Sequence, residues 1–144
     1  MSANITKVDV WAGEIMDQPG GLASKLGAVA KAGASLEFLV ARRSPDQPGK
    51  GVVFVAPLKG AAQTKAAAGA GLSKAVGMYS LRLEAPDKPG LGAKVAQAVA
   101  NASINLRGLS AAALGKKCVV YFSFDSDADA KKAAAALKKA LAGK

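Results

Sequence analysis

The sequence contains no histidine and only one cysteine, Cys118. Without histidine, Ser-His-Asp and Cys-His catalytic arrangements are excluded. One cysteine also excludes the usual zinc ligand sets and an intrachain disulfide. No apolar run reaches the roughly 18 residues of a membrane span, and Met1–Val10 has charges but no apolar segment of a secretory signal. These absences predict a cytoplasmic protein, away from the membrane, with no catalysis, no metal and no cofactor.

Small side chains and positive charge dominate what is present. Alanine (33 residues) and glycine (16) make up about a third of the 144 residues, whereas aromatic residues are only 5 %. The chain therefore predicts a folded domain with a thin core. Twenty lysines and arginines against ten acidic residues give a net charge of +10, which favours nucleic acid as one alternative partner. The strand aromatics do not follow the basic-aromatic pattern of RNA-binding sheets, so nucleic acid stays the alternative.

A repeat with an offset of 70 residues organises the chain. Asp17-Gln18-Pro19-Gly20 recurs as Asp87-Lys88-Pro89-Gly90, and matches such as Val29 with Val99 continue in register. A third copy, at residues 46–49, leads directly into a strand-like run, which indicates a hairpin turn. The repeat predicts two units, residues 1–76 and residues 77–144.

Periodicity predicts an α+β fold in which each unit reads strand, helix, strand, strand, helix. The expected strands are 6–13, 35–42, 51–57, 78–85, 104–112 and 117–124, and the expected helices are 20–33, 60–69, 90–102 and 127–142. A short strand within 72–76 closes the first unit. The second unit has no fourth strand of its own, so its sheet must end early, borrow an edge strand or be covered by a partner.

The segment from Glu84 to Leu106 resembles the signature of ACT domains, which has a strand, Asp-x-Pro-Gly-x-Leu, a helix and a Gly-Ile-Asn-Ile-like entry to the next strand. Asp17–Leu22 fits the opening motif even better. The resemblance covers nearly the whole chain as two copies. It implies ferredoxin-like βαββαβ units, with antiparallel sheets and helices on one face, and a regulatory protein that binds an amino acid. Two departures are Ser35 where the second copy has Asn105, and Gly92 where the family prefers leucine.

The resemblance places the ligand beside the turn between the first strand and the first helix, at an interface between units. Carried over, the ligand-binding residues are Asp17, Gly20, Gly21 and Leu22 in the first copy, and Asp87, Gly90, Leu91 and Asn105 in the second. The residues themselves support this, because glycine at a helix start lets a ligand approach free N–H groups that favour a carboxylate. Either aspartate is suited to pair with an ammonium group. The alternative is that both turns are only helix caps.

Four further expectations follow from single features. Cys118 is expected to be a buried, inert strand residue, and Trp11 to pack in a core or an interface. Asp125, Asp127 and Asp129 are expected to cap the last helix, because the glycine and glutamate of a calcium loop are missing. The second unit's missing strand predicts a homodimer or larger homo-oligomer. A purely structural assembly subunit is a third alternative to the sensor and the nucleic-acid module.

Overall fold

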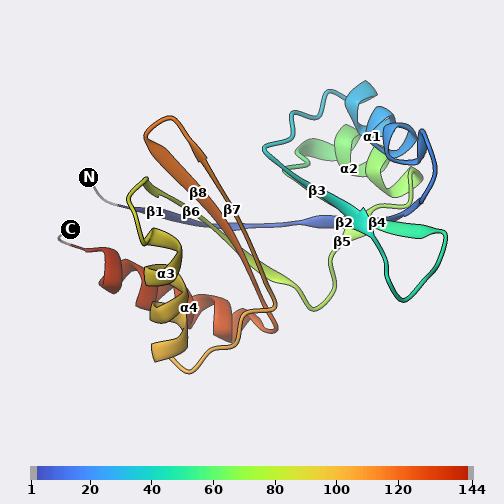
Figure 1. Cartoon of the computed structure of the whole chain (residues 1–144). Coiled ribbons are helices and arrows are strands. Elements are labelled where there is room, and N and C mark those ends of the chain that lie inside the picture. Colours follow the sequence, from blue (N-terminus) through green and yellow to red (C-terminus); the bar gives the residue numbers. More distant parts are fainter. Residues whose placement is uncertain (1–2, 143–144) are drawn as a thin grey trace. The chain divides into compact units, whose positions relative to one another are not determined.

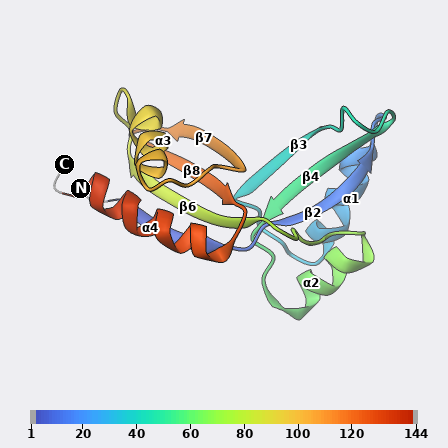
Figure 2. The same cartoon turned by 90° about the horizontal axis from the view of Figure 1, so that it is seen from below.

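The computed structural model describes residues 3–142, which form two compact units (Figures 1 and 2). Asp9–Val76 form one unit, called the N-terminal unit here. The residues up to Val8 join those from Gly77 onward in the other, called the C-terminal unit. Each unit has a four-stranded antiparallel sheet and two helices.

In the N-terminal unit the chain follows a βαββαβ order. The elements are β2 (Trp11–Met16), α1 (Gly21–Lys31), β3 (Phe38–Arg43), β4 (Lys50–Ala56), α2 (Gly60–Gly69) and β5 (Ser73–Lys74). The sheet order is β3-β4-β2-β5, with every neighbouring pair antiparallel. Both helices pack on one face of this sheet (Figure 1). The hairpin turn expected at residues 46–49 joins β3 to β4.

The C-terminal unit repeats this plan, except that one edge strand of its sheet comes from the start of the chain. Its elements are β6 (Tyr79–Pro86), α3 (Leu91–Asn101), β7 (Gly108–Leu114), β8 (Lys117–Phe124) and α4 (Asp127–Leu141), together with β1 (Asn4–Val8) from the start of the chain. The sheet order β1-β6-β8-β7 puts β1 in the place that β5 takes in the N-terminal unit. Two ferredoxin-like units are therefore confirmed, as are the four predicted helices.

The single strand expected at residues 6–13 is wrong. Asp9 and Val10 separate β1 from β2, and the two strands enter different sheets: Ile5 pairs with Leu83, whereas Trp11 pairs with Val55. Residues up to Val8 thus group with the C-terminal unit, although the division by sequence assigned them to residues 1–76. Borrowing an edge strand is how the second sheet is completed. The missing strand therefore no longer argues for a dimer.

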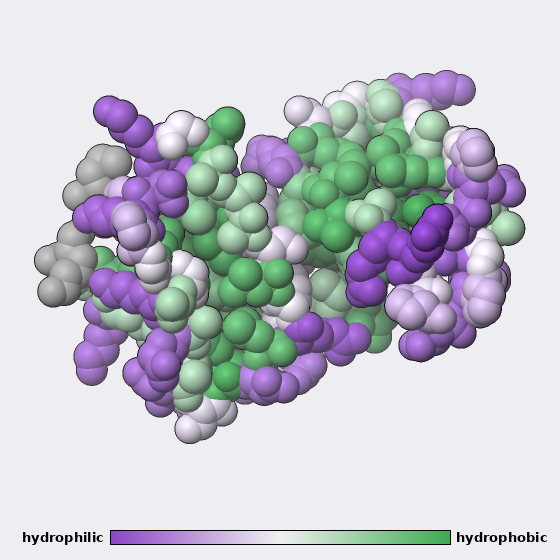
Figure 3. Space-filling model, viewed as in Figure 1, coloured by the Kyte–Doolittle hydropathy of each residue, from purple (hydrophilic) through white to green (hydrophobic). Residues whose placement is uncertain are grey.

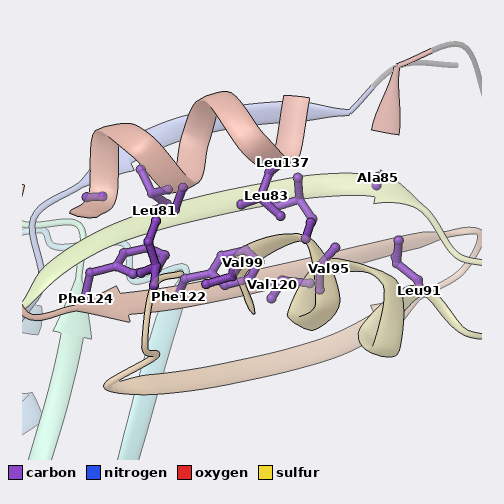
Figure 4. Close-up of a cluster of buried hydrophobic side chains, with 14 residues drawn as sticks. Leu81, Leu83, Ala85, Leu91, Val95, Val99, Val120, Phe122, Phe124 and Leu137 are labelled. Atoms are coloured by element: carbon purple, nitrogen blue, oxygen red, sulfur yellow. The ribbon is translucent and has the colours of Figure 1, made fainter. Parts of the chain in front are cut away.

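Each unit has its own hydrophobic core. In the C-terminal unit, β6, β8, α3 and α4 bury side chains that include Leu83, Val95, Phe122 and Leu137 (Figure 4). The rings of Phe122 and Phe124 stack with centroids 6.1 Å apart. Helix α3 fits this core because its buried residues follow a helical period. Cys118 packs against the same core as a partly buried residue.

The core of the N-terminal unit is smaller, as the alanine-rich composition predicts. Five residues form it: Val29, Val53, Val55, Ala67 and Leu72. Trp11 packs against this cluster, which confirms its expected packing role. Hydrophobic residues also reach the surface of both units, where they gather in patches with hydrophilic residues around them (Figure 3); large side chains such as Leu39, Leu109 and Leu114 are among the exposed ones.

Candidate functional site

The two Asp-x-Pro-Gly turns share one backbone arrangement. The amide of Asp17 donates to Gly49 O (3.0 Å), and that of Asp87 donates to Lys116 O (2.8 Å), so each turn is tied to the neighbouring hairpin. Gly20 and Gly90 are the N-cap residues of α1 and α3, with φ of 85° and 83°. Glycine suits both positions, because L side chains rarely adopt this left-handed conformation.

Neither aspartate caps its helix. No side-chain capping bond is made at the start of α1 or α3. Instead, Asp17 Oδ2 accepts a hydrogen bond from Arg43 Nε at 2.8 Å. Within residues 3–142, the amide groups of Leu22 and Ala23 have no hydrogen-bond partner, which is usual for the first turn of a helix. The start of α1 therefore keeps donors for an anionic group.

The fold itself requires glycine at position 21. A Cβ atom at this position would lie 2.2 Å from Met16 O. The reason is local: Gln18 N donates to Met16 O (2.9 Å), which folds the end of β2 back over the helix start. Gly21 has no left-handed φ, so its constraint is steric. A residue larger than glycine at this position would therefore disturb the turn itself, whether or not a ligand binds there.

A pocket of about 630 Å³ lies at the first turn. The turn lines it with Gln18, Pro19, Gly20 and Gly21, and β2 adds Glu14, Ile15 and Met16, while α1 adds Ser24, Lys25 and Ala28. Ala70, just after α2, closes one side, and its carbonyl accepts a 2.6 Å hydrogen bond from Lys25 Nζ. Glu14 forms an ion pair with Lys50 at 3.2 Å. The pocket therefore combines an ammonium group, a carboxylate, a hydroxyl and apolar surface.

The pocket at the second turn is much smaller, about 170 Å³. Leu91 stands where the first turn has Gly21, and its side chain is buried in the C-terminal core. Lys88 and Lys94 line the pocket in place of Gln18 and Ser24. The second turn thus has the same backbone arrangement as the first turn but a much smaller pocket.

The structure does not bring all the predicted ligand-binding residues together. Asn105 is exposed in the loop between α3 and β7, about 16 Å of helix away from Gly90. Asp17 and Asp87 do not line the two pockets, whereas Gly20, Gly21, Gly90 and Leu91 do. Leu22 packs against the core of its unit.

Glu14, Ser24 and Lys25 also line the pocket at the first turn but were not predicted from the sequence. Their place near the turn could have been inferred, because Ser24 and Lys25 follow Gly20 by about one helical turn, and Glu14 lies two residues before the end of β2.

Other candidate groups have structural roles. Ser126, and not the neighbouring aspartates, caps α4 by accepting from Asp129 N at 3.0 Å. Asp127 contacts Lys7 and Lys131, which lower the pKa of its carboxyl. Within residues 3–142, no group of three His, Cys, Asp or Glu side chains is arranged to hold a metal. Burial, with a smaller effect of the Asp87 carboxylate, raises the pKa of the Cys118 thiol, so it is less reactive than a free thiol.

None of the helices in the described part of the chain is both long and apolar enough to cross a membrane.

Comparison with known proteins defines the fold. Neither a known protein-family profile nor a curated protein matches the sequence. Among solved structures, protein BT0572 from Bacteroides thetaiotaomicron is similar with a TM-score of 0.77 and 14 % identity, over 94 % of this chain and 89 % of that one. The regulatory subunit of aspartate kinase from Thermus thermophilus, in its ligand-free form, has a TM-score of 0.69 and 19 % identity over 97 % of both chains.

A third similar structure is E. coli aspartokinase III in complex with aspartate and ADP. Its TM-score is 0.61 at 14 % identity, over 96 % of this chain and 33 % of that enzyme. The chain therefore has the fold of aspartate kinase regulatory domains, at identities that establish the fold alone.

Proposed function

We propose that this protein is a regulatory sensor without catalysis, which binds an amino acid in the pocket at the start of α1. The observation that carries the proposal is the pocket of about 630 Å³ built around Gly20 and Gly21. It lies at the turn that the ACT resemblance assigns to the ligand. The fold likeness to the regulatory subunit of aspartate kinase supports the regulatory class.

The polar groups of the pocket suit a zwitterion. The Lys25 ammonium, which lines the pocket, favours the carboxylate, and so does the nearby start of α1, since a helix N-terminus carries roughly half a positive charge. The Glu14 carboxylate is the partner for the ligand's ammonium group, and the ligand's side chain lies against Ile15 and Ala28. The second turn does not bind the ligand, because Leu91 takes the place of Gly21 and two lysines line its smaller pocket.

Regulation would follow from the position of the pocket. The ligand contacts β2, α1 and the end of α2 together, so binding favours the conformation in which these elements are closed on one another. A partner protein, or the oligomerisation of this protein, then responds to the population of that conformation.

A thermal-shift screen against the amino acids tests the proposal. A ligand at 100 times its dissociation constant stabilises the folded protein by about 2.7 kcal/mol. Ser24→Leu fills the pocket from an exposed helix position, so it should abolish the shift and leave the melting temperature without ligand nearly unchanged. Ala30→Leu is the matched control, because Ala30 is an exposed residue of α1 outside the pocket. Equal shifts in both variants would place the ligand elsewhere.

We propose in addition that the protein self-associates, through the edge strand β7. Three of the four sheet edges are protected by charge or shortness: β3 carries Arg42 and Arg43, β1 carries Lys7, and β5 has two residues. Strand β7 has neither charge nor proline, and Leu114 is 82 % exposed. Antiparallel pairing about Ala111 would set Leu114 opposite Gly108 of a second copy, large against small.

Light scattering tests this pairing with a matched pair of variants. Ala111 and Ala41 occupy corresponding edge positions, opposite Val120 and Val53. Ala111→Lys should convert a dimer to a monomer, whereas Ala41→Lys should leave the dimer intact. A wild-type monomer at high concentration and moderate salt would overturn the proposal.

A further inference from the structure

We infer that the outer face of α4 is a docking surface for the phosphate backbone of a nucleic acid. This inference is independent of the ligand pocket, which belongs to the other unit. It starts from the distribution of charge. The C-terminal unit contains twelve lysines and arginines against five acidic residues, a net +7, whereas the N-terminal unit contains eight against five, a net +3.

Four lysines form the cationic face of α4: Lys131, Lys132, Lys138 and Lys139. At 100° per residue they lie within about a third of the helix circumference, and the two pairs are about 10.5 Å apart along the axis. The opposite side, with Ala133 and Leu137, is fully buried. Exposed Ala135 lies between the two pairs, so no bulky side chain obstructs the approach of a polyanion.

The charge of this face is not neutralised within the unit. Lys131 Nζ lies 3.2 Å from Asp127 Oδ2, but Asp127 also accepts from Lys7 at 2.8 Å, so two cations share one carboxylate. Among residues 3–142, Lys132, Lys138 and Lys139 take part in no ion pair. The acidic residues of α4 are confined to its first turn.

The chemistry of the face favours nucleic acid over other anionic partners. A membrane-surface helix needs an exposed apolar side, and the apolar side of α4 is already buried in the core. Protein interfaces are depleted in lysine and enriched in aromatic residues, whereas this face has only lysine and alanine. Duplex DNA carries one charge for each 1.7 Å or so of its axis, so the face spans enough phosphates for all four lysines.

The experiment measures binding of the full chain to a short mixed-sequence DNA duplex as salt is varied. Four phosphate contacts predict a log–log salt slope of about −3.6, which weakens binding about 150-fold between roughly 50 and 200 mM salt. The double variant Lys138→Gln/Lys139→Gln should reduce the slope to about −1.8 and the loss to about 12-fold. The control, Lys31→Gln/Lys65→Gln, has the same net charge and changes exposed residues of α1 and α2.

The control variant should retain the wild-type slope. Single-stranded RNA, polyglutamate and vesicles with phosphatidylserine are measured beside the duplex. Equal slopes for the two double variants would reduce the interaction to diffuse charge and overturn the inference. Binding to polyglutamate or vesicles without binding to either nucleic acid would also overturn it, as would absence of duplex binding at the lowest salt.

Discussion

Gly21→Ala is expected to destabilise the N-terminal unit by about 3 kcal/mol, the upper end of the usual cost of forcing an extra carbon into a packed site. The added Cβ would lie 2.2 Å from Met16 O, and this neighbour is backbone that is held by Gln18 N. Trp11 is the only tryptophan and lies in this unit. Denaturant unfolding followed by tryptophan fluorescence therefore measures the loss directly.

Gly20→Ala separates this steric effect from backbone strain. Gly20 has φ of 85°, but a Cβ there would meet nothing within 4 Å. Its substitution should therefore cost only about 1 kcal/mol, for the left-handed conformation alone. If the two variants were equally stable, the close approach of Met16 O would not constrain the turn.

Removal of residues 1–8 is expected to destabilise the C-terminal unit, although these residues are adjacent in sequence to the N-terminal unit. Strand β1 pairs with β6 over five residues, and Ile5 packs against the C-terminal core. Loss of this strand exposes the edge of β6, so we expect a cost of at least about 3 kcal/mol. Both tyrosines, Tyr79 and Tyr121, lie in this unit, so near-ultraviolet circular dichroism of tyrosine reports its unfolding.

Point variants of β1 serve as controls for the truncation. Ile5→Ala should reproduce part of the loss, about 2 kcal/mol. Thr6→Ala, at an exposed position whose side chain points to the other face, should stay within about 0.5 kcal/mol. A truncation that shifted the Trp11 transition and left the tyrosine transition in place would contradict the assignment of β1.

Local patterns predicted most of the fold, because they are set by neighbouring residues. The period of α3 and the β-branched run of β4 each specify an element without information from elsewhere in the chain. The split between β1 and β2 could not be predicted in this way. Both runs alternate, and what separates them is that Ile5 and Trp11 pair with strands of different units.

The candidate site was predicted less completely than the fold. The Asp-x-Pro-Gly motif located both turns, but the motif is the same in an open pocket and in a filled one. The difference lies in Gly21 against Leu91, and it became visible only with the side chain of Leu91 placed in the core. Asp17 was predicted to bind the ligand, with a helix cap as the alternative, yet its carboxylate bonds to Arg43, a contact between residues 26 positions apart.

The most direct test of a ligand site at the first turn is an amide chemical-shift titration of the full chain with the amino acid that gives the largest thermal shift. We expect the amide signals of Gly20–Lys25 and Glu14 to shift in a saturable manner and those of Gly90–Lys94 to stay in place. Saturable shifts at Gly90–Lys94 without shifts at Gly20–Lys25, or no saturable shift with any amino acid, would contradict this expectation.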